Sequence, residues 1–373
     1  MTSDDVLLSV VVPVYNALPW LEGCLSSVAK AMGSVPGRSE LICVDDGSTD
    51  GSSRVVDDWA SRLPDVVSVI HQPNSGRGAA RNAGLDAARG SWVSFVDADD
   101  LVPPDAFARL WAHVGSCGGA GMVKGTFRTF ADGGKGGDAP APTDTGLTSA
   151  PSASESVMVS SSDYRHLLFD LQGSTPPLGR LSVPEGYEQL LLASCCGALY
   201  RRADVERGSV RFPVGLRFGE DVLFNHLFAS AAPSVMLTGE VAYLQNVGNE
   251  GTIRRYGPDD ARYVRELLAR WAAQGLDGGP YAGDLSCMMA REVTFLFMRR
   301  LSRDSSRLTG EETDVVMSYA ELFGRDLDVR RFCPATSKIW PLWRAALGAL
   351  KAGRPAPYVR AVRLMAAVRR LGR

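Results

Sequence analysis

A cluster of aspartates directly after an apolar run is the feature of this chain best suited to chemistry. Asp97, Asp99 and Asp100 end the β-prone run at residues 91–96. Carboxylates a few ångströms apart repel one another and raise each other's pKa, so a bound cation stabilises such a cluster. Hard oxygen ligands suit Mg²⁺ or Mn²⁺, which proteins often share with a substrate phosphate.

A second carboxylate pair, Asp45 and Asp46, follows the apolar run at residues 41–44. In an open α/β sheet, ligands bind beyond the carboxyl ends of the strands. Two acidic strand ends therefore predict one metal–phosphate site at one edge of a sheet.

The elements that position these residues alternate along the first 110 residues. Apolar runs predict strands at 7–14, 41–44, 66–70 and 91–96, and helical spacing predicts helices at 18–32, 51–62 and from the glycine-rich turn 74–78 to Ala88. Strands that are apolar throughout and separated by helices are typical of a parallel sheet covered on both faces. The predicted fold class is α/β, with a mostly parallel sheet flanked by helices.

The rest of the chain divides by composition. We expect regional boundaries near residues 125 and 256, with a helical region at 257–373. Residues 131–162 are rich in Gly, Ser, Ala, Pro and Thr, which predicts a mobile insertion or loop, with order resuming near Tyr164.

Bulk properties exclude some classes of protein. The 373 residues are 45% hydrophobic and 22% charged, as in a globular protein large enough for two domains, and the net charge of −2 predicts no nucleic-acid partner. The acidic start does not resemble a signal peptide, and no apolar run approaches the roughly 18 residues that span a bilayer. The seven cysteines lack metal-type spacing, which predicts reduced, buried thiols and a cytoplasmic location.

The segment at 333–373 is basic and contains no Asp or Glu. Apolar residues, including Trp340 and Trp343, are interleaved with Lys338, Arg344, Lys351, Arg354, Arg360, Arg363, Arg369, Arg370 and Arg373. Basic amphipathic helices that carry Trp lie in membrane interfaces and are attracted to anionic lipid. Peripheral contact with the inner face of the cell membrane is one interpretation, and a packed helix with a solvated basic face is the other.

Four motifs occur in order: residues 9–16, 44–51, 74–84 and 95–100. Their sequence and spacing closely resemble family 2 glycosyltransferases of the GT-A fold over residues 7–110. The resemblance continues more loosely through residues 212–225, and Tyr243 with residues 251–253 looks like a degenerate later feature of the family.

The resemblance implies an enzyme that uses a nucleotide-sugar donor, expected to be a UDP-sugar. It also implies a nucleotide-sugar-binding half at 1–125 and an acceptor-binding half at 126–256. It assigns Asp99 to the Mn²⁺ or Mg²⁺ ion, which would neutralise the diphosphate and stabilise the leaving group. The residues it assigns to the donor are Pro13, Tyr15 and Asn16 along the base, Asp45 or Asp46 as acceptor of a hydrogen bond from the base, Arg81 near the base or diphosphate, and Asp97 at the ribose.

The later motif supplies the implied catalytic group. Asp221 resembles the catalytic base of the family, which takes the proton of an acceptor hydroxyl as that oxygen attacks the anomeric carbon. The resemblance implies inversion by a single displacement, and a positioned base contributes roughly 10²–10⁴-fold in rate. Its neighbour Glu220 could instead orient the acceptor.

Several of these residues also have plain structural interpretations. Asp100 could cap the next helix, Arg77 could be a solvated surface residue, and Glu220 with Asp221 could cap a helix. His226 is interpreted as structural rather than as a metal ligand.

The chain also departs from the family pattern. Members often carry Trp and Lys where this chain has Cys195-Cys196, which would reshape the acceptor pocket. The Gln-X-X-Arg-Trp motif of processive synthases is absent, so we expect the addition of one or a few sugars. The acceptor could be a glycan, a lipid-linked intermediate or a small molecule.

The sequence also allows three other functions to be compared with the glycosyltransferase interpretation. A catalytically inactive sugar-binding module would require loss of the Asp motif or of the base, and both are intact. A sugar nucleotidyltransferase would show a glycine-rich loop after the first strand, where this chain has Pro13 to Asn16. A dinucleotide-dependent oxidoreductase would need a third glycine after Gly76 and Gly78 at the required position.

Overall fold

The computed structural model describes residues 5–115, 118–131, 156–169, 194–215, 219–248, 260–273, 309–327 and 340–371, and individual helical residues between 283 and 301. The chain divides into two compact units. The first comprises Met1–Leu168 with Leu181–Thr252, and the second comprises Phe169–Arg180 with Ile253–Arg373. The boundary expected between residues 125 and 126 falls inside a strand of the first unit.

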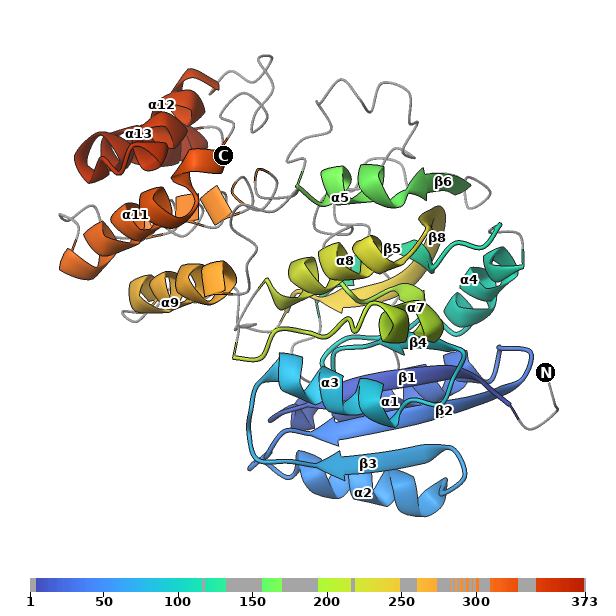
Figure 1. Ribbon diagram of the computed structural model, residues 1–373. Helices are drawn as coiled ribbons and strands as arrows, with labels where there is room; N and C mark the ends of the chain where they lie inside the picture. The colour runs from blue at the N-terminus through green and yellow to red at the C-terminus, as the bar shows by residue number, and fades with distance from the viewer. Residues whose placement is uncertain are drawn as a thin grey trace. The chain divides into compact units, whose positions relative to one another are not determined.

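An eight-stranded mixed sheet forms the first unit (Figure 1), in the order β3-β2-β1-β4-β7-β5-β8-β6. The four strands from β3 to β4 are parallel, β7 is antiparallel to both of its neighbours, and β6 is antiparallel to β8. The strands are β1 Val6–Val14, β2 Arg38–Asp45, β3 Val67–His71, β4 Trp92–Phe95, β5 Met122–Phe130, β6 Ser156–Ser160, β7 Ala198–Arg201 and β8 Ser234–Asn246. The predicted α/β class is confirmed.

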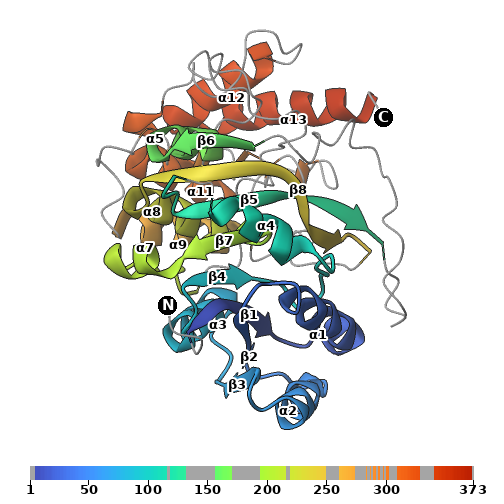
Figure 2. The ribbon, with the colours of Figure 1, turned by 90° about the vertical axis from the view of Figure 1, so that its right-hand side faces the viewer.

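Helices cover both faces of the parallel half of the sheet. Figure 2 shows α1 and α2 on one face and α3 on the other. The helices of this unit are α1 Leu18–Met32, α2 Ser52–Arg62, α3 Arg77–Ala87, α4 Ala106–Val114, α5 Ser161–Phe169, α7 Arg202–Arg207 and α8 Glu220–Ala231. The predicted bounds of α1, 18–32, are confirmed. Pro19 in the first turn and leucines at helical spacing favour a helix over these residues.

One glycine brings α3 close to the sheet. A Cβ atom on Gly84 would lie 2.2 Å from Cγ1 of Val11 in β1, nearer than real Cβ atoms come to other atoms. Glycine therefore lets the helix backbone approach the strand. This contact sets the position of the α3 side chains at the end of the sheet, including Arg81.

An aromatic cluster joins β4 and β7 to α8. The Phe95 ring contacts the Phe212 ring edge-on with centroids 5.0 Å apart, and the Phe212 ring stacks on Phe224 at 3.9 Å. Tyr200 contacts Phe224 and Phe228 edge-on. These buried rings attach the α8 helix to the centre of the sheet, because large aromatic side chains contribute most of the apolar burial in a core.

The expectation of a loop from 131 to 162 is wrong at its C-terminal end. Residues 156–160 form β6, which pairs with β8, and α5 follows at Ser161–Phe169. Because β6 is a short edge strand paired on one side only, its alternating exposure gives a weak sequence signal. The remainder of the expected insertion, 132–155, lies outside the described residues.

The second unit is helical in its described parts, as predicted. Its helices are α9 Asp260–Ala273, α11 Gly310–Leu322, α12 Trp340–Lys351 and α13 Pro355–Leu371, and a 3₁₀ turn spans Gly324–Asp326. A capping box begins α11, in which Thr309 accepts from the Glu312 amide and the Glu312 carboxylate accepts from the Thr309 amide. Arg300 forms a buried ion pair with Glu312 at 2.7 Å.

Two expectations about bulk properties can be compared with the described residues. Cys24, Cys43, Cys195 and Cys196 are free and buried, as predicted. Among the helices that the structure describes, none combines the length and the apolarity needed to cross a lipid bilayer.

Candidate functional site

Asp45 ends β2 and organises the loop that follows it. Its carboxylate accepts hydrogen bonds from the Ser48 amide at 3.0 Å and the Ser53 hydroxyl at 2.7 Å, and it contacts His71 Nδ1 at 3.0 Å. Burial would raise the pKa of this carboxyl, but these hydrogen bonds lower it. Asp45 is thus an ionised anchor for the loop at residues 46–51.

Asp46 holds the turn that begins α3. It accepts hydrogen bonds from Gln72 Nε2 at 2.7 Å, the Ser75 amide at 2.9 Å and the Gly76 amide at 2.8 Å. The family resemblance assigns either Asp45 or Asp46 to the nucleotide base. Both are buried and engaged with neighbouring loops in this structure, so their contact with a base stays a prediction.

The loop after β1 lies beside the loop after β2. Asn16 has a positive φ of 50°, its side chain accepts from the Thr49 amide at 2.8 Å, and its amide donates to the Ser48 hydroxyl at 3.1 Å. Tyr15 is 52% exposed, whereas Pro13 is buried. Tyr15 and Asn16 are therefore open to a ligand at the carboxyl edge of the sheet, and Pro13 supports their loop from below.

The aspartates after β4 have different surroundings. Asp100 is buried, accepts hydrogen bonds from Tyr243 Oη and the Asn246 amide, both at 2.6 Å, and so connects β4 to β8. Burial, followed by the nearby charges of Asp99 and Asp97, raises the pKa of Asp100. Because α4 begins only at Ala106, the interpretation of Asp100 as a helix cap is wrong.

Asp97 and Asp99 remain partly exposed next to this buried carboxyl. Their hard oxygen atoms suit Mg²⁺ or Mn²⁺, and a cation there would relieve the repulsion among the three aspartates. Within the described part of the chain, no group of three His, Cys, Asp or Glu gathers as a complete metal cluster. These ions commonly take one or two protein carboxylates and complete their shells with water and substrate phosphate. The donor set fits an ion held jointly with a phosphorylated substrate.

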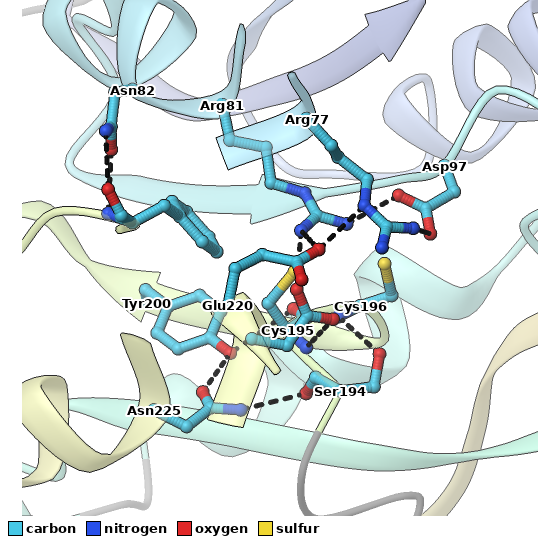
Figure 3. Close-up of polar contacts among 12 residues, drawn as sticks. Arg77, Arg81, Asn82, Asp97, Ser194, Cys195, Cys196, Tyr200, Glu220 and Asn225 are labelled. Atoms are coloured by element: carbon cyan, nitrogen blue, oxygen red, sulfur yellow. Dashed lines mark hydrogen bonds and ion pairs between the residues drawn. The ribbon is translucent and has the colours of Figure 1, made fainter. Parts of the chain in front are cut away.

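Arg81 lies at the centre of the site and is fully buried (Figure 3). Its Nη2 donates to Asp97 Oδ1 at 2.7 Å, and its Nη1 donates to Glu220 Oε1 at 3.1 Å and to Asp221 Oδ1 at 2.5 Å. The guanidinium also lies over the Phe212 ring, 5.2 Å from its centroid. Arg81 therefore links the end of β4 to the start of α8. Its predicted contact with the donor stays a prediction, since burial directs this side chain to the carboxylates.

Arg77 belongs to the same cluster, so its interpretation as a solvated surface residue is wrong. Its Nε pairs with Glu220 Oε1 at 2.7 Å, and its Nη1 lies 3.7 Å from Asp97 Oδ2. Its position one turn before Arg81 on α3 is the signal that could have placed it here, because residues i and i+4 share a helix face.

The two acidic residues at the start of α8 differ in exposure. Glu220 is 1% exposed, and Asp221 is 22% exposed. The N-cap of α8 is Gly219, so neither residue caps the helix, although the helix dipole favours both negative charges in the first turn. Asp221 can reach an acceptor, whereas Glu220 holds the two arginines; burial argues against the predicted acceptor contact of Glu220.

The charges around Asp221 set its protonation state. Burial would raise its pKa, but the charges of Arg81 and Arg77 and a hydrogen bond from the Cys195 amide at 3.3 Å lower it below the usual value. The pKa of Glu220 is shifted in the opposite direction. Burial and the negative charge of Asp221 raise it, and they outweigh the charges of Arg77 and Arg81, which lower it. Asp221 is therefore ionised at neutral pH.

His226 lies one turn beyond this pair on α8 and is buried. Burial and the charge of Arg165 lower its pKa to about 4. A buried neutral imidazole beside a cation agrees with the structural interpretation of this residue.

The sequence did not point to the residues that hold the backbone next to Asp221. Lys124 of β5 and Asn225 of α8 hold the backbone at Ser194 to Cys196, which contacts Asp221. The available signal was a lysine directly after the apolar pair Met122-Val123 at the start of the strand, because an unpaired charge is rarely buried.

Comparisons with known proteins identify relatives of the first part of the chain. The model of glycosyl transferase family 2 matches residues 9–144. The uncharacterized glycosyltransferase EpsJ of Bacillus subtilis is 42% identical over 104 residues, which are 28% of this chain and 29% of EpsJ. Glycosyltransferase GlyG of Streptococcus pneumoniae is 38% identical over 109 residues, 29% of this chain and 35% of GlyG.

A solved structure extends the likeness in fold. S. aureus TarS 1–349 in complex with UDP-GlcNAc has a TM-score of 0.65 and 20% sequence identity, covering 96% of this chain and 90% of that one. At this identity the likeness shows the shared fold. The curated relatives are matched over about a third of their length.

Proposed function

We propose that this chain, which belongs to glycosyl transferase family 2 through residues 9–144, transfers a sugar from a nucleotide-sugar to an acceptor hydroxyl with inversion at the anomeric carbon. The observation that carries the proposal is the ion-pair cluster in which Arg81 joins Asp97, at the end of β4, to Asp221, at the start of α8. The cluster brings together Asp97, the proposed donor-side carboxylate, and the partly exposed Asp221, the proposed base, which supports the proposal.

The donor would bind along the carboxyl ends of β1, β2 and β4. Tyr15 and Asn16 lie open beside the loop after β2 and would contact the base, and Asp97 would hold the ribose. Asp99 would hold Mn²⁺ or Mg²⁺, which supplies positive charge to a leaving diphosphate. A UDP-sugar is the proposed donor, on the resemblance of these motifs to the family.

Asp221 would act as the base. It takes the proton of the acceptor hydroxyl, the acceptor oxygen forms a bond to the anomeric carbon, and the bond from that carbon to the diphosphate breaks. Because Arg81 and Arg77 lower the pKa of Asp221, it is ionised at neutral pH but is a weaker base than an unperturbed carboxylate. Its contribution therefore depends on orientation as much as on basicity.

We also propose the biological context and the location. Cell-surface polysaccharide or glycoconjugate synthesis in the cytoplasm fits the family and relatives such as a poly(ribitol-phosphate) beta-glucosyltransferase of Bacillus spizizenii, 36% identical over 106 residues. Exposed basic residues on α12 and α13, including Arg344, Lys351 and Arg360, would allow peripheral contact with anionic lipid.

Nucleotide release tests the proposal. The protein is incubated with a panel of UDP-, GDP- and dTDP-sugars, with and without Mn²⁺, and slow hydrolysis to water replaces transfer while the acceptor is unknown. We expect release from one donor, abolished by EDTA. An absence of both release and donor binding under every condition would favour a catalytically inactive sugar-binding module.

A further inference from the structure

A buried lysine lies beneath the proposed base. Lys124, in the middle of β5, is 1% exposed. Its Nζ donates to the Ser194 carbonyl at 2.6 Å and to the Cys196 carbonyl at 3.2 Å. A buried ammonium group requires acceptors, because an unpaired one is costly. Lys124 meets this requirement by holding the backbone just before β7.

The backbone that Lys124 holds is in contact with Asp221. The amide of Cys195, between the two carbonyls, donates to Asp221 Oδ2 at 3.3 Å. The other oxygen, Oδ1, accepts from Arg81. The two donors approach different oxygens and together fix the plane of the carboxylate. Orientation of a base matters because proton transfer requires hydrogen-bond geometry.

A second side chain holds the same carbonyl. Asn225 is fully buried on α8, one turn after Asp221, and its Nδ2 donates to the Ser194 carbonyl at 3.1 Å. Its Oδ1 accepts from Tyr200 Oη at 2.7 Å (Figure 3). A ring of contacts therefore runs from Asp221 along one helical turn to Asn225, across to Ser194, and back through the Cys195 amide.

We infer that Lys124 is a positioning residue for Asp221, acting through the Ser194 and Cys196 carbonyls. The inference rests on the proposed function only for the role of Asp221 as a base. Asn225 completes the support from α8. The Lys124 ammonium is also a third positive charge near the Asp221 carboxylate, in addition to Arg81 and Arg77.

The charged and titratable groups around Asp221 in the part of the chain that the structure describes bear on the test. They are Arg77 and Arg81 of α3, Asp97 after β4, Glu220 of α8, Cys195 and Cys196 before β7, Tyr200 of β7 and Lys124 of β5. Burial lowers the pKa of Lys124 to about 8, although interactions with Cys195, Cys196 and Asp221 act to raise it. The experiment is therefore performed near pH 7, where the ammonium form predominates.

The test is amide exchange in protein labelled with ¹⁵N-cysteine, comparing wild type with Lys124→Met. We expect the Cys195 amide to exchange at least about tenfold faster in the variant, because its loop is no longer held. The amides of Cys43 in β2 and Cys24 in α1 serve as internal controls and should keep their rates. Arg300→Met removes a buried cation from the second unit and should leave Cys195 unchanged.

The same variant is assayed for nucleotide release and for UDP binding in Mn²⁺. We expect kcat to fall about tenfold or more while the Kd for UDP is unchanged, since the Cys195 amide of this loop donates to Asp221. If Lys124→Met does not fold, Asn225→Leu removes the second donor to Ser194 and should give the same pattern.

The outcomes separate the inference from the proposed function. An unchanged Cys195 rate, or equal acceleration of all three amides, would overturn the positioning role. Selective acceleration at Cys195 together with no nucleotide release by wild type would support the positioning of Asp221 and overturn the proposed function.

Discussion

Arg81 and Asp221 are separated by 140 residues in the sequence, yet Arg81 Nη1 and Asp221 Oδ1 lie 2.5 Å apart. Arg81 comes from α3, which packs on the parallel half of the sheet, and Asp221 begins α8, which packs beside β7. The same guanidinium holds Asp97 after β4. A single buried cation therefore aligns the donor-side and acceptor-side halves of the proposed site.

Replacing Asp221 with Asn should abolish transfer without weakening donor binding. An amide occupies the same space and can accept from Arg81, but it cannot take a proton. We expect nucleotide release to fall about 10²–10⁴-fold with an unchanged Kd for UDP. Asp86→Asn, at an exposed surface ion pair with Arg211, is the matched control and should retain full activity. Full activity in Asp221→Asn would assign the base to another residue.

Asp99→Ala should remove the metal dependence of donor binding. UDP affinity measured by calorimetry should rise at least about tenfold on addition of Mn²⁺ to wild type, a difference of about 1.4 kcal/mol, and should not respond in the variant. The Asp105→Ala variant should behave as wild type. Asp105 is exposed, lies directly before α4 and pairs with Arg109. An equal response to Mn²⁺ in Asp99→Ala would contradict its assignment as metal ligand.

Arg81→Met should strongly destabilise the first unit. The substitution leaves Asp97, Glu220 and Asp221 close together without the guanidinium that pairs with all three, while Arg77 stays paired with Asp97 and Glu220. Loss of one partner from a buried ion cluster costs about 3–5 kcal/mol, which urea unfolding can measure. Arg62→Met provides the comparison, because Arg62 and Glu22 are both more than half exposed and such pairs contribute about 0–1 kcal/mol. A similar decrease in the free energy of unfolding in the two variants would contradict the central role of Arg81.

Arg77→Met should move the acid limb of the pH–rate profile to higher pH. Arg77 lowers the pKa of Asp221, so its removal raises that pKa, and the base becomes protonated at a higher pH than in wild type. Arg81 remains to hold the carboxylates, so the fold should persist. Arg211→Met removes a surface arginine and should leave the profile unchanged. A shift of the limb to lower pH would contradict the electrostatic account.

His71 should make stability depend on pH. Its hydrogen bonds with Asp45 and then Asp57 raise its pKa above 6.5, so the stabilisation is complete below the unfolded pKa and is lost as pH rises through the folded value. Because the ring is 49% exposed, the effect should be below about 1 kcal/mol. A double-mutant cycle of His71→Asn with Asp57→Asn should show coupling at pH 5.5 that disappears at pH 9. An equal coupling energy at pH 5.5 and pH 9 would show that the interaction does not depend on the charge of His71.

Local patterns in the sequence determined the parallel half of the fold. The strands and helices up to residue 95 lie within a few residues of their predicted bounds, because apolar runs, helical spacing and glycine-rich turns act over a few residues. The same patterns placed the aspartates after β2 and β4 at strand ends. The motifs that carry the family resemblance lie in this region, which is also where the family model begins its match.

Only the tertiary structure decided which partner each polar side chain has. Arg77 and Arg81 pair with carboxylates more than 130 residues away in sequence, Asp100 binds β8 instead of capping a helix, and Lys124 supports a loop 70 residues further on. No local period encodes such contacts, because they depend on how the antiparallel strand β7 and helix α8 pack against the parallel half. A buried charge must find a partner, and the packed chain determines which partner lies within reach.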